Sequence, residues 1–304
     1  MIASPFASPL FAPMAIALAA LLAMFLVAIA ISHRVRVAEI RRSVLFRRWK
    51  VWAIIAPVFS LAALAGTVPL ATLIAVIASI GAWEYGRLTG ISGWHTLVLV
   101  AAASITPFLA LSTQSTLLTA ASVGVLAATG IPLVIRNDGH AVRSVAFMLL
   151  GLGWVAWLPA HVVLLAKDGP HGVAIVLALG LGVALSDVGA FVVGRAWGRR
   201  KLAPKISPNK TVEGLIGNVA GAYAGFLIVA GLLQLDPGLP VLLGAPAVIA
   251  LGCVWGDLAE SALKREFGRK DSGAWLPGFG GLLDRVDSLL IAAPLLFHFL
   301  REVA

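Results

Sequence analysis

Acidic residues are scarce in this chain, and their distribution is uneven. Of the 14 Asp and Glu residues, six fall between positions 256 and 288: Asp257, Glu260, Glu266, Asp271, Asp284 and Asp287. The flanking sequence is mostly apolar, and a carboxylate near apolar surroundings is costly unless it has a partner or a function. This segment is therefore the first place to look for chemistry.

The spacing of these acids predicts two polar helix faces. One face carries residues at i, i+3, i+4 and i+7, namely Asp257, Glu260, Ser261 and Lys264. The other repeats the first three offsets where the last apolar run begins, at Asp284, Asp287 and Ser288. If the two faces converge, their oxygens suit Mg²⁺, which is usually held by one or two carboxylates together with substrate phosphates. No His or Cys is interleaved, which disfavours zinc.

Ion pairing explains the acids alone equally well. Glu260 and Lys264 are one helical turn apart, a favourable distance for a salt bridge, and structural ion-pair networks resemble catalytic ones. The segment between the acid pairs favours a polyphosphate site instead. It holds Lys264-Arg265, Lys270-Asp271 and Pro277-Gly278-Phe279-Gly280-Gly281. Glycines let backbone N–H groups approach a ligand closely, and the basic side chains can neutralise phosphate oxygens.

A second polar segment lies at residues 186–214. Asp187 is near the end of an apolar run, where it either serves a ligand or pairs with Arg195. The run Lys205-Ile206-Ser207-Pro208-Asn209-Lys210-Thr211 is expected to open a new helix, whose N-terminal N–H groups and positive end favour an anion. A loop that only sets topology would explain the lysines, but not the Ser, Asn and Thr beside them.

The rest of the chain must position these residues. The 304 residues are 60% hydrophobic and 12% charged, with a mean hydropathy of +0.97, whereas soluble domains have about 25% charged residues. A water-soluble or disordered chain is excluded. Because a span needs about 20 apolar residues, we predict an all-α polytopic membrane helical bundle of about nine or ten transmembrane helices. The apolar runs fall near 10–31, 51–66, 68–82, 94–111, 116–135, 144–166, 172–193, 214–233, 240–255 and 288–300.

The basic residues indicate the orientation of this bundle. They cluster at 33–50 and 195–210, two segments separated by an even number of predicted spans, so both are expected in the cytoplasm. The acid-rich segment then falls on the same side. The net charge of +9 is explained by topology, and no nucleic-acid partner is expected. The first apolar run has no preceding positive charge and is expected to be a retained span. One integral membrane domain is expected, with N-terminal spans at 1–185 and the chemistry at 186–304.

These motifs resemble those of the phosphatidate cytidylyltransferases, or CDP-diacylglycerol synthases. The likeness rests on a signature that begins Ser261-Ala-Leu-Lys264-Arg265 and ends Gly280-Gly281-Leu-Leu-Asp284-Arg285-Val-Asp287. Residues 206–214 and the run Gly256-Asp257-Leu258 resemble two further motifs, so the likeness covers the chain from position 186 to position 290. Two positions depart from the family pattern: Phe279 stands where the family has His, and Val212 where Trp is common.

The resemblance implies a Mg²⁺-dependent nucleotidyltransferase of phospholipid biosynthesis that transfers CMP from CTP to phosphatidate, releasing pyrophosphate. It implies CTP and phosphatidic acid as partners, an active site facing the cytoplasm from a bacterial-type inner membrane, and it leaves a homodimer open. The catalytic residues it implies are Asp257, Lys264, Arg265, Asp284, Arg285 and Asp287, of which Asp257, Asp284 and Asp287 would hold the metal. The substrate-binding residues it implies are Asp187, Ser207, Asn209, Lys210, Thr211, Ser261, Lys270, Asp271, Gly280 and Gly281.

Three alternatives stay open on the sequence alone. The departure at Phe279 leaves room for a paralogue that acts on another lipid phosphate or nucleotide. A non-catalytic homologue would bind lipid or CTP without turnover. A transporter would use intramembrane acids along an ion path, although the chain lacks the internal repeat that transporters often show.

Overall fold

The computed structural model describes residues 4–32, 43–112, 124, 141–169, 171–273 and 280–303, and most of these residues are helical, which confirms the predicted all-α class. The first half contains η1 (Pro5–Ala7), α1 (Phe11–Ser32), α3 (Val44–Leu64), α4 (Thr67–Thr89), α5 (Gly93–Leu109), α7 (Ala141–Gly151), the π-helical turn η2 (Leu152–Trp157) and α8 (Ala160–Lys167). The second half contains α9 (Gly172–Trp197), β1 (Lys201–Ala203), β2 (Ser207–Thr211), α10 (Val212–Leu232), α11 (Leu239–Glu266) and α12 (Leu283–Val303).

Several helices have the length and composition of membrane spans. In the described part of the chain, five segments are long and apolar enough to cross a membrane: Thr67–Thr89, Val142–Lys167, Gly172–Trp197, Val212–Leu232 and Leu239–Glu266. Three shorter apolar helices accompany them, at Phe11–Val27, Trp49–Leu64 and Gly93–Leu109. The run predicted at 116–135 lies outside the described residues, apart from Gly124.

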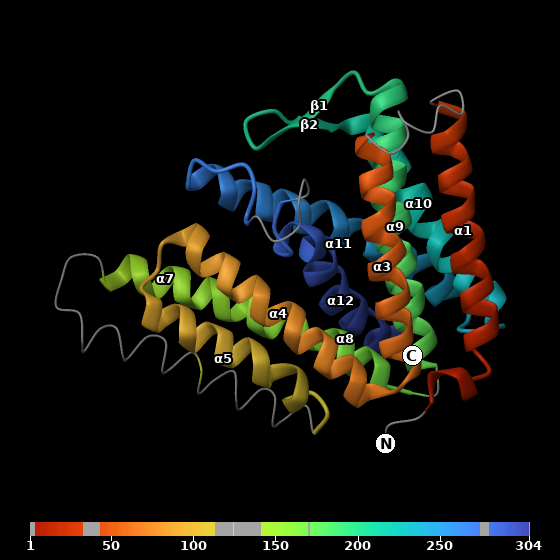
Figure 1. The fold of residues 1–304 in the computed structure, drawn as a ribbon, viewed down its shortest axis with the longest axis horizontal. Coiled ribbons are helices and arrows are strands. Elements are labelled where there is room, and N and C mark those ends of the chain that lie inside the picture. The colour runs from red at the N-terminus through yellow and green to blue at the C-terminus, as the bar shows by residue number, and fades with distance from the viewer. Residues whose placement is uncertain are drawn as a thin grey trace.

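The helices form two groups that share α12. On one side α1, α3 and α9 run side by side, with α10 packed on α9; on the other, α4 pairs with α5 and α7 (Figure 1). Between them α12 contacts α4, α8, α9 and α11. Its residues Leu296 and Phe297 belong to the larger hydrophobic core, and Leu283 and Leu290 to the smaller one around Tyr85. The helix that carries Asp284 and Asp287 is therefore held by both cores.

The helices α11 and α12 approach each other at a glycine. A Cβ built on Gly256 would collide with the backbone carbonyl of Asp287 and with Ser288. Small residues allow this kind of close backbone contact between helices in a membrane. The contact places the residues next to Gly256, including Asp257, against α12 at Asp287 and Ser288.

Two segments depart from the sequence prediction. The apolar run at 144–166 is not one regular helix, because the π-helical turn η2 separates α7 from α8. The prediction that the run through Thr211 opens a helix is wrong for Ser207 to Lys210, which form strand β2 of an antiparallel hairpin. Only Thr211 takes a helical role, as the N-cap whose side chain accepts from Gly214 N at 3.1 Å.

A carboxylate that follows the hairpin holds the two ends of the hairpin together. Glu213 accepts hydrogen bonds from the backbone N–H groups of Arg199 and Arg200, at 2.9 and 3.2 Å to Oε2. Val212 N also donates to the Arg200 carbonyl at 2.9 Å. These bonds draw the chain after α9 alongside the chain before α10. Pro208 favours an extended backbone and has no N–H to contribute to a helix.

The close approach at Gly256 predicts a specific sensitivity. Gly256→Ala should lower the unfolding free energy by about 1–3 kcal/mol, the usual range for overpacking, because the added Cβ meets backbone that cannot rotate away. Thermal unfolding in detergent, followed by tryptophan fluorescence, measures the change. Gly231→Ala is the control, since a Cβ at this exposed helical glycine meets nothing within 4 Å. Equal melting temperatures for the two variants would contradict the close contact.

Candidate active site

The polar face predicted for the end of α11 is present. Ser261 Oγ donates to Asp257 Oδ1 at 3.3 Å, and Lys264 Nζ donates to Glu260 Oε2 at 2.6 Å. Both pairs are four residues apart, as the helical spacing predicts. The acids of α11 and α12 do not form one set, however. They divide into two groups, each with its own lysine, and Asp287 lies within charge range of both groups.

The first group, here called the Lys264 cluster, consists of Lys264, Glu260 and Asp284. The Lys264 ammonium lies 2.6 Å from Glu260 Oε2 and 2.5 Å from Asp284 Oδ1, and all three side chains are largely buried. Asp284 Oδ2 accepts from Gly281 N at 2.7 Å and from Ser272 N at 3.1 Å. Both oxygens of Asp284 are therefore engaged by groups of the protein, so in this cluster the predicted ion pairing is realised.

One atom of the Lys264 cluster has no hydrogen-bond partner in the described part of the chain. Glu260 Oε1 is buried and accepts no hydrogen bond from the described residues. Two carboxylates also share a single ammonium, so the cluster is short of positive charge. A buried, unsatisfied carboxylate oxygen is a place where a proton or a hard cation would be stabilised.

The second group, here called the Asp187 cluster, joins three helices and the hairpin. It consists of Asp187 on α9, Asp257 on α11, Asp287 on α12 and Lys210 on β2. Lys210 Nζ lies 2.6 Å from Asp257 Oδ2. Asp187 and Asp287 each lie within range of the Asp257 and Lys210 charges. Sequence analysis left Asp187 open to pairing with Arg195, but here its neighbours are these acids, Lys210 and Arg285.

The two clusters differ in their access to solvent. In the Lys264 cluster the side chains of Glu260 and Asp284 are 2% and 6% exposed. In the Asp187 cluster the Asp257 side chain is 40% exposed, and Asp187 is exposed although residues of three other elements act on it. Asp187 and Asp257 therefore face open space, whereas Asp287 is buried at 7% exposure, so a ligand can reach this cluster through Asp187 and Asp257.

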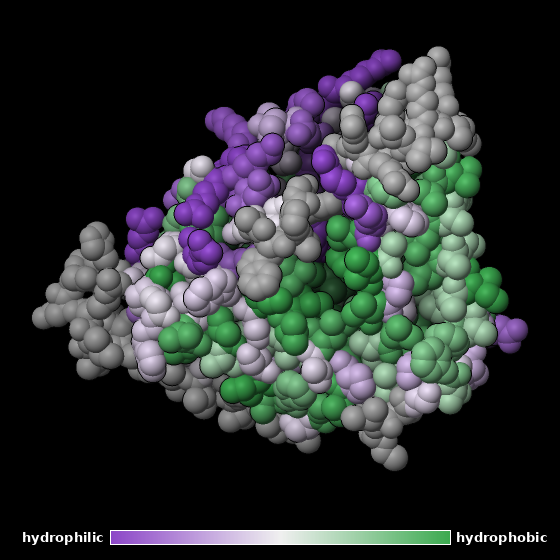
Figure 2. Space-filling view, in the orientation of Figure 1, coloured by the Kyte–Doolittle hydropathy of each residue, from purple (hydrophilic) through white to green (hydrophobic). Residues whose placement is uncertain are grey.

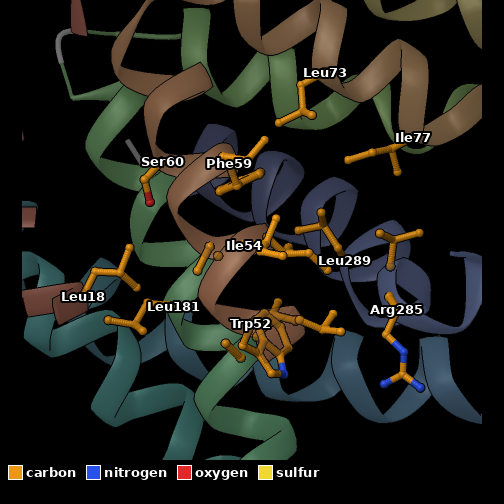
Figure 3. Close-up of a pocket in the computed structure, with 18 of the residues that line it drawn as sticks. Leu18, Trp52, Ile54, Phe59, Ser60, Leu73, Ile77, Leu181, Arg285 and Leu289 are labelled. Atoms are coloured by element: carbon orange, nitrogen blue, oxygen red, sulfur yellow. The ribbon is translucent and has the colours of Figure 1, made fainter. Parts of the chain in front are cut away.

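An apolar cavity of about 250 Å³ lies beside this cluster. Its walls come from α1, α3, α4, α9 and α12, and Arg285 is its charged residue. Figure 3 shows Arg285 at one end and Leu18 and Leu181 at the other, with Trp52 and Leu289 between. In Figure 2 the surface is hollowed between the two helix groups, with hydrophobic residues around the hollow and hydrophilic residues gathered above it. No local sequence pattern marks this cavity, because its lining comes from five separate helices.

The remaining predicted site residues lie on the hairpin and on the loop between α11 and α12, and they differ in exposure. On the hairpin, Lys210 and Ser207 are half-buried and Asn209 is exposed. Arg265 is directed to the hairpin, where its Nε donates to the Ile206 carbonyl at 3.2 Å. Lys270 and Asp271 are exposed on the loop after α11. Gly280 has φ of 82°, a left-handed conformation that favours glycine. Phe279 lies outside the described residues.

The residues present suit Mg²⁺ better than zinc. Within the described ranges, no three His, Cys, Asp or Glu residues surround one point closely enough to enclose a metal by themselves. The donors that are available are carboxylate oxygens, and Asp257 already attracts a cation, the Lys210 ammonium. Mg²⁺ commonly keeps water ligands and binds through one or two carboxylates and substrate phosphates. The donor set therefore fits Mg²⁺ if a phosphate substrate completes the coordination.

One residue that sequence analysis missed contacts this region. Glu84 on α4 is 2% exposed and accepts hydrogen bonds from Leu282 N and Leu283 N at the start of α12. No motif surrounds it in the sequence, so no local pattern marked it.

Comparisons with known proteins confirm the predicted family resemblance. A family model described as the cytidylyltransferase family matches residues 46–303. The chain is 42% identical over 193 residues to a phosphatidate cytidylyltransferase of Brucella suis, covering 57% of this chain and 70% of that protein. It is 37% identical over 231 residues to one of Pseudomonas aeruginosa, covering 74% and 84%, and 37% identical over 170 residues to one of Staphylococcus saprophyticus, covering 56% and 64%.

The Lys264 cluster predicts a large stability effect from one substitution. Lys264→Met leaves two buried carboxylates without their cation, and breaking a buried ion pair from one side costs about 3–5 kcal/mol. The melting temperature of the purified protein should fall sharply. Adding Glu260→Gln should restore part of the loss, because one negative charge is removed. Lys270→Met, at an exposed lysine, is the matched control and should leave the melting temperature unchanged. If the two lysine substitutions behave alike, the cluster does not have the role described.

Proposed function

The chain belongs to the cytidylyltransferase family, and we propose that it transfers the cytidylyl group of CTP to phosphatidate, with CDP-diacylglycerol and pyrophosphate as products. The observation that carries the proposal is the meeting of three carboxylates with Lys210 and Arg285 at the end of an apolar cavity. Such a place suits a substrate that is charged at one end and apolar at the other. The names of the Brucella and Pseudomonas relatives support the same substrate.

We assign the lipid to the cavity and the nucleotide to the hairpin side. Arg285 lies at the end of a cavity that is otherwise apolar, so a phosphate headgroup beside Arg285 would leave the acyl chains among the leucines. Arginine suits a phosphate because its planar guanidinium donates several hydrogen bonds. Lys210, Ser207 and Asn209 on the hairpin offer donors for the triphosphate from the opposite side of Asp257.

The proposed reaction makes modest demands on the protein. A phosphatidate oxygen attacks the α-phosphorus of CTP, the bond from that phosphorus to the β-phosphate oxygen breaks, and pyrophosphate leaves. The attacking group is a phosphate monoester with a second pKa of about 6, so it is largely ionised at neutral pH and needs no strong general base. Catalysis then consists of holding two anions in line and neutralising their charge.

Mg²⁺ is the metal we propose for this site. Asp257 and Asp287 would hold it: Asp257 is open to a ligand, and Asp287, which is buried, lies within range of the Asp257 charge. Asp284, whose oxygens accept from Lys264 and from two backbone N–H groups, is assigned to maintaining the turn beside them. When bound, the metal would neutralise charge on the phosphate oxygens. The basic side chains Lys210 and Arg285 would position the two substrates.

The orientation we propose places the hairpin side in the cytoplasm. The hairpin region holds five exposed basic residues, Arg195, Arg199, Arg200, Lys201 and Lys205, and clusters of this kind are retained on the cytoplasmic side. The loop after α11 lies on the same side, since Arg265 bonds to the hairpin. CTP is a cytoplasmic metabolite, so this orientation also supplies the substrate.

Pyrophosphate release tests the proposed function. Purified protein should release pyrophosphate from CTP when phosphatidate and Mg²⁺ are both present, and EDTA should stop the reaction.

Asp257→Asn should reduce the rate by about 10²-fold or more, because it removes a carboxylate from the reacting centre. Binding of CTP without release of pyrophosphate would identify a non-catalytic homologue, and release only with another lipid phosphate would identify a different substrate.

The cavity predicts an effect on chain length. Ala56→Trp fills part of the cavity, so KM for a long-chain phosphatidate should rise roughly tenfold, which is the effect of a steric cost of about 1–2 kcal/mol. KM for CTP and for a very short-chain phosphatidate should stay the same. Ala220→Trp, at an exposed position of α10, serves as the control. Equal effects on long and short lipids would place the acyl chains elsewhere.

A further inference from the structure

A buried carboxylate far from the motifs holds the start of α12. Glu84 Oε1 accepts from Leu282 N at 3.0 Å and Glu84 Oε2 accepts from Leu283 N at 2.8 Å, a contact between residues 198 and 199 positions apart. The residue is 2% exposed. Two charge-assisted hydrogen bonds to one side chain, away from water, make a strong and directional contact.

These two N–H groups need an acceptor from outside the helix. The first N–H groups of a helix have no partner within it, and a Ser, Thr, Asp or Asn at the N-cap usually supplies one. Before α12 the chain reads Gly280-Gly281-Leu282, and none of these side chains has an oxygen. Glu84 therefore supplies from α4 the cap that the local sequence lacks, and its negative charge matches the positive end of the helix.

The surrounding loop leaves room for this carboxylate and little else. A Cβ built on Gly281 would collide with Glu84 Oε2, and one on Gly273 with Glu84 Oε1. The same Gly281 donates its N–H to Asp284 Oδ2 at 2.7 Å. Asp284 thus accepts from the N–H group of Gly281, and Glu84 accepts from the next two N–H groups along the chain. Together these bonds determine where α12 begins and how its first turn is oriented.

The start of α12 carries two groups assigned to the reaction. Arg285 and Asp287 both follow within five residues of the capped N–H groups, next to the supporting Asp284. We infer that Glu84 is a positioning residue for the transfer reaction: by capping α12 from another helix, it fixes the carboxylates and Arg285 of that helix relative to Asp257. This inference rests on the proposed function for its catalytic consequence, but the capping contact itself does not.

Kinetics of Glu84 variants test the catalytic consequence. Glu84→Gln keeps one acceptor oxygen and turns an NH₂ group toward the other N–H, and Glu84→Ala removes both acceptors. The turnover number should fall roughly 10–100-fold in the alanine variant, the range found when groups that orient metal ligands are removed, and less in the glutamine variant. The Mg²⁺ concentration for half-maximal activity should rise, which a general loss of folded protein would not cause.

A substitution at the next residue of α4 provides the matched control for the Glu84 variants. Tyr85 is also fully buried on α4, and its hydroxyl donates to the Phe147 carbonyl at 2.7 Å, away from the start of α12. Tyr85→Phe removes one buried hydrogen bond from the same helix and should leave the Mg²⁺ dependence unchanged. If Tyr85→Phe and Glu84→Gln alter the Mg²⁺ dependence equally, or neither alters it, the positioning role is refuted.

Hydrogen exchange tests the cap without any activity. In detergent-solubilised Glu84→Gln and Glu84→Ala, amides in a peptide covering 280–290 should exchange roughly tenfold faster than in the parent protein, because the first turn frays. A peptide from α10 should exchange at the parent rate. Unchanged exchange at 280–290 would overturn the inference. A parent protein with no transferase activity would overturn the proposed function alone, since the exchange result would still decide whether the cap exists.

Discussion

Each carboxylate of the two clusters lies among helices that carry few charges, so the free energy of burying it depends on the cation that it contacts. A buried acid without such a partner would be destabilising by several kcal/mol. Lys264 meets two acids inside the bundle, and Lys210 meets Asp257 from the hairpin. The positions of these two lysines therefore determine which acids are fixed in the structure and which are accessible to a ligand.

The two lysines lie on different kinds of secondary structure. Lys264 is on α11 and forms its ion pairs in a closed environment, so its cluster behaves as part of the framework. Lys210 is on a short hairpin attached through Glu213 and Arg265, and its partner Asp257 is open to solvent. A cation that approaches Asp257 competes with Lys210, which then becomes available to an incoming phosphate. The arrangement separates a rigid support from the proposed reaction centre, whose ion pair is open to exchange.

The sequence predicts the local parts of this arrangement well. The offsets between Asp257, Glu260, Ser261 and Lys264 predict a common helix face, because helical neighbours are set by spacing alone. The hairpin was not predictable from its own residues, since it depends on Glu213 reaching back 13 and 14 positions to two backbone N–H groups. The division of the acids into two clusters was also hidden, because it depends on how α9, α11 and α12 pack. The orientation of a side chain toward one lysine or another is a tertiary property.

The contact between Glu84 and the start of α12 bears on whether the C-terminal part of the chain can function alone. Every residue of the signature lies after position 186, which suggests that the C-terminal part is a self-sufficient catalytic unit. The carboxylate that completes the first turn of α12 comes from α4, however, and part of the smaller hydrophobic core comes with it. A fragment that retained the whole signature would lack this support. An intact signature in a gene fragment or a fusion product is therefore an insufficient criterion for a working enzyme.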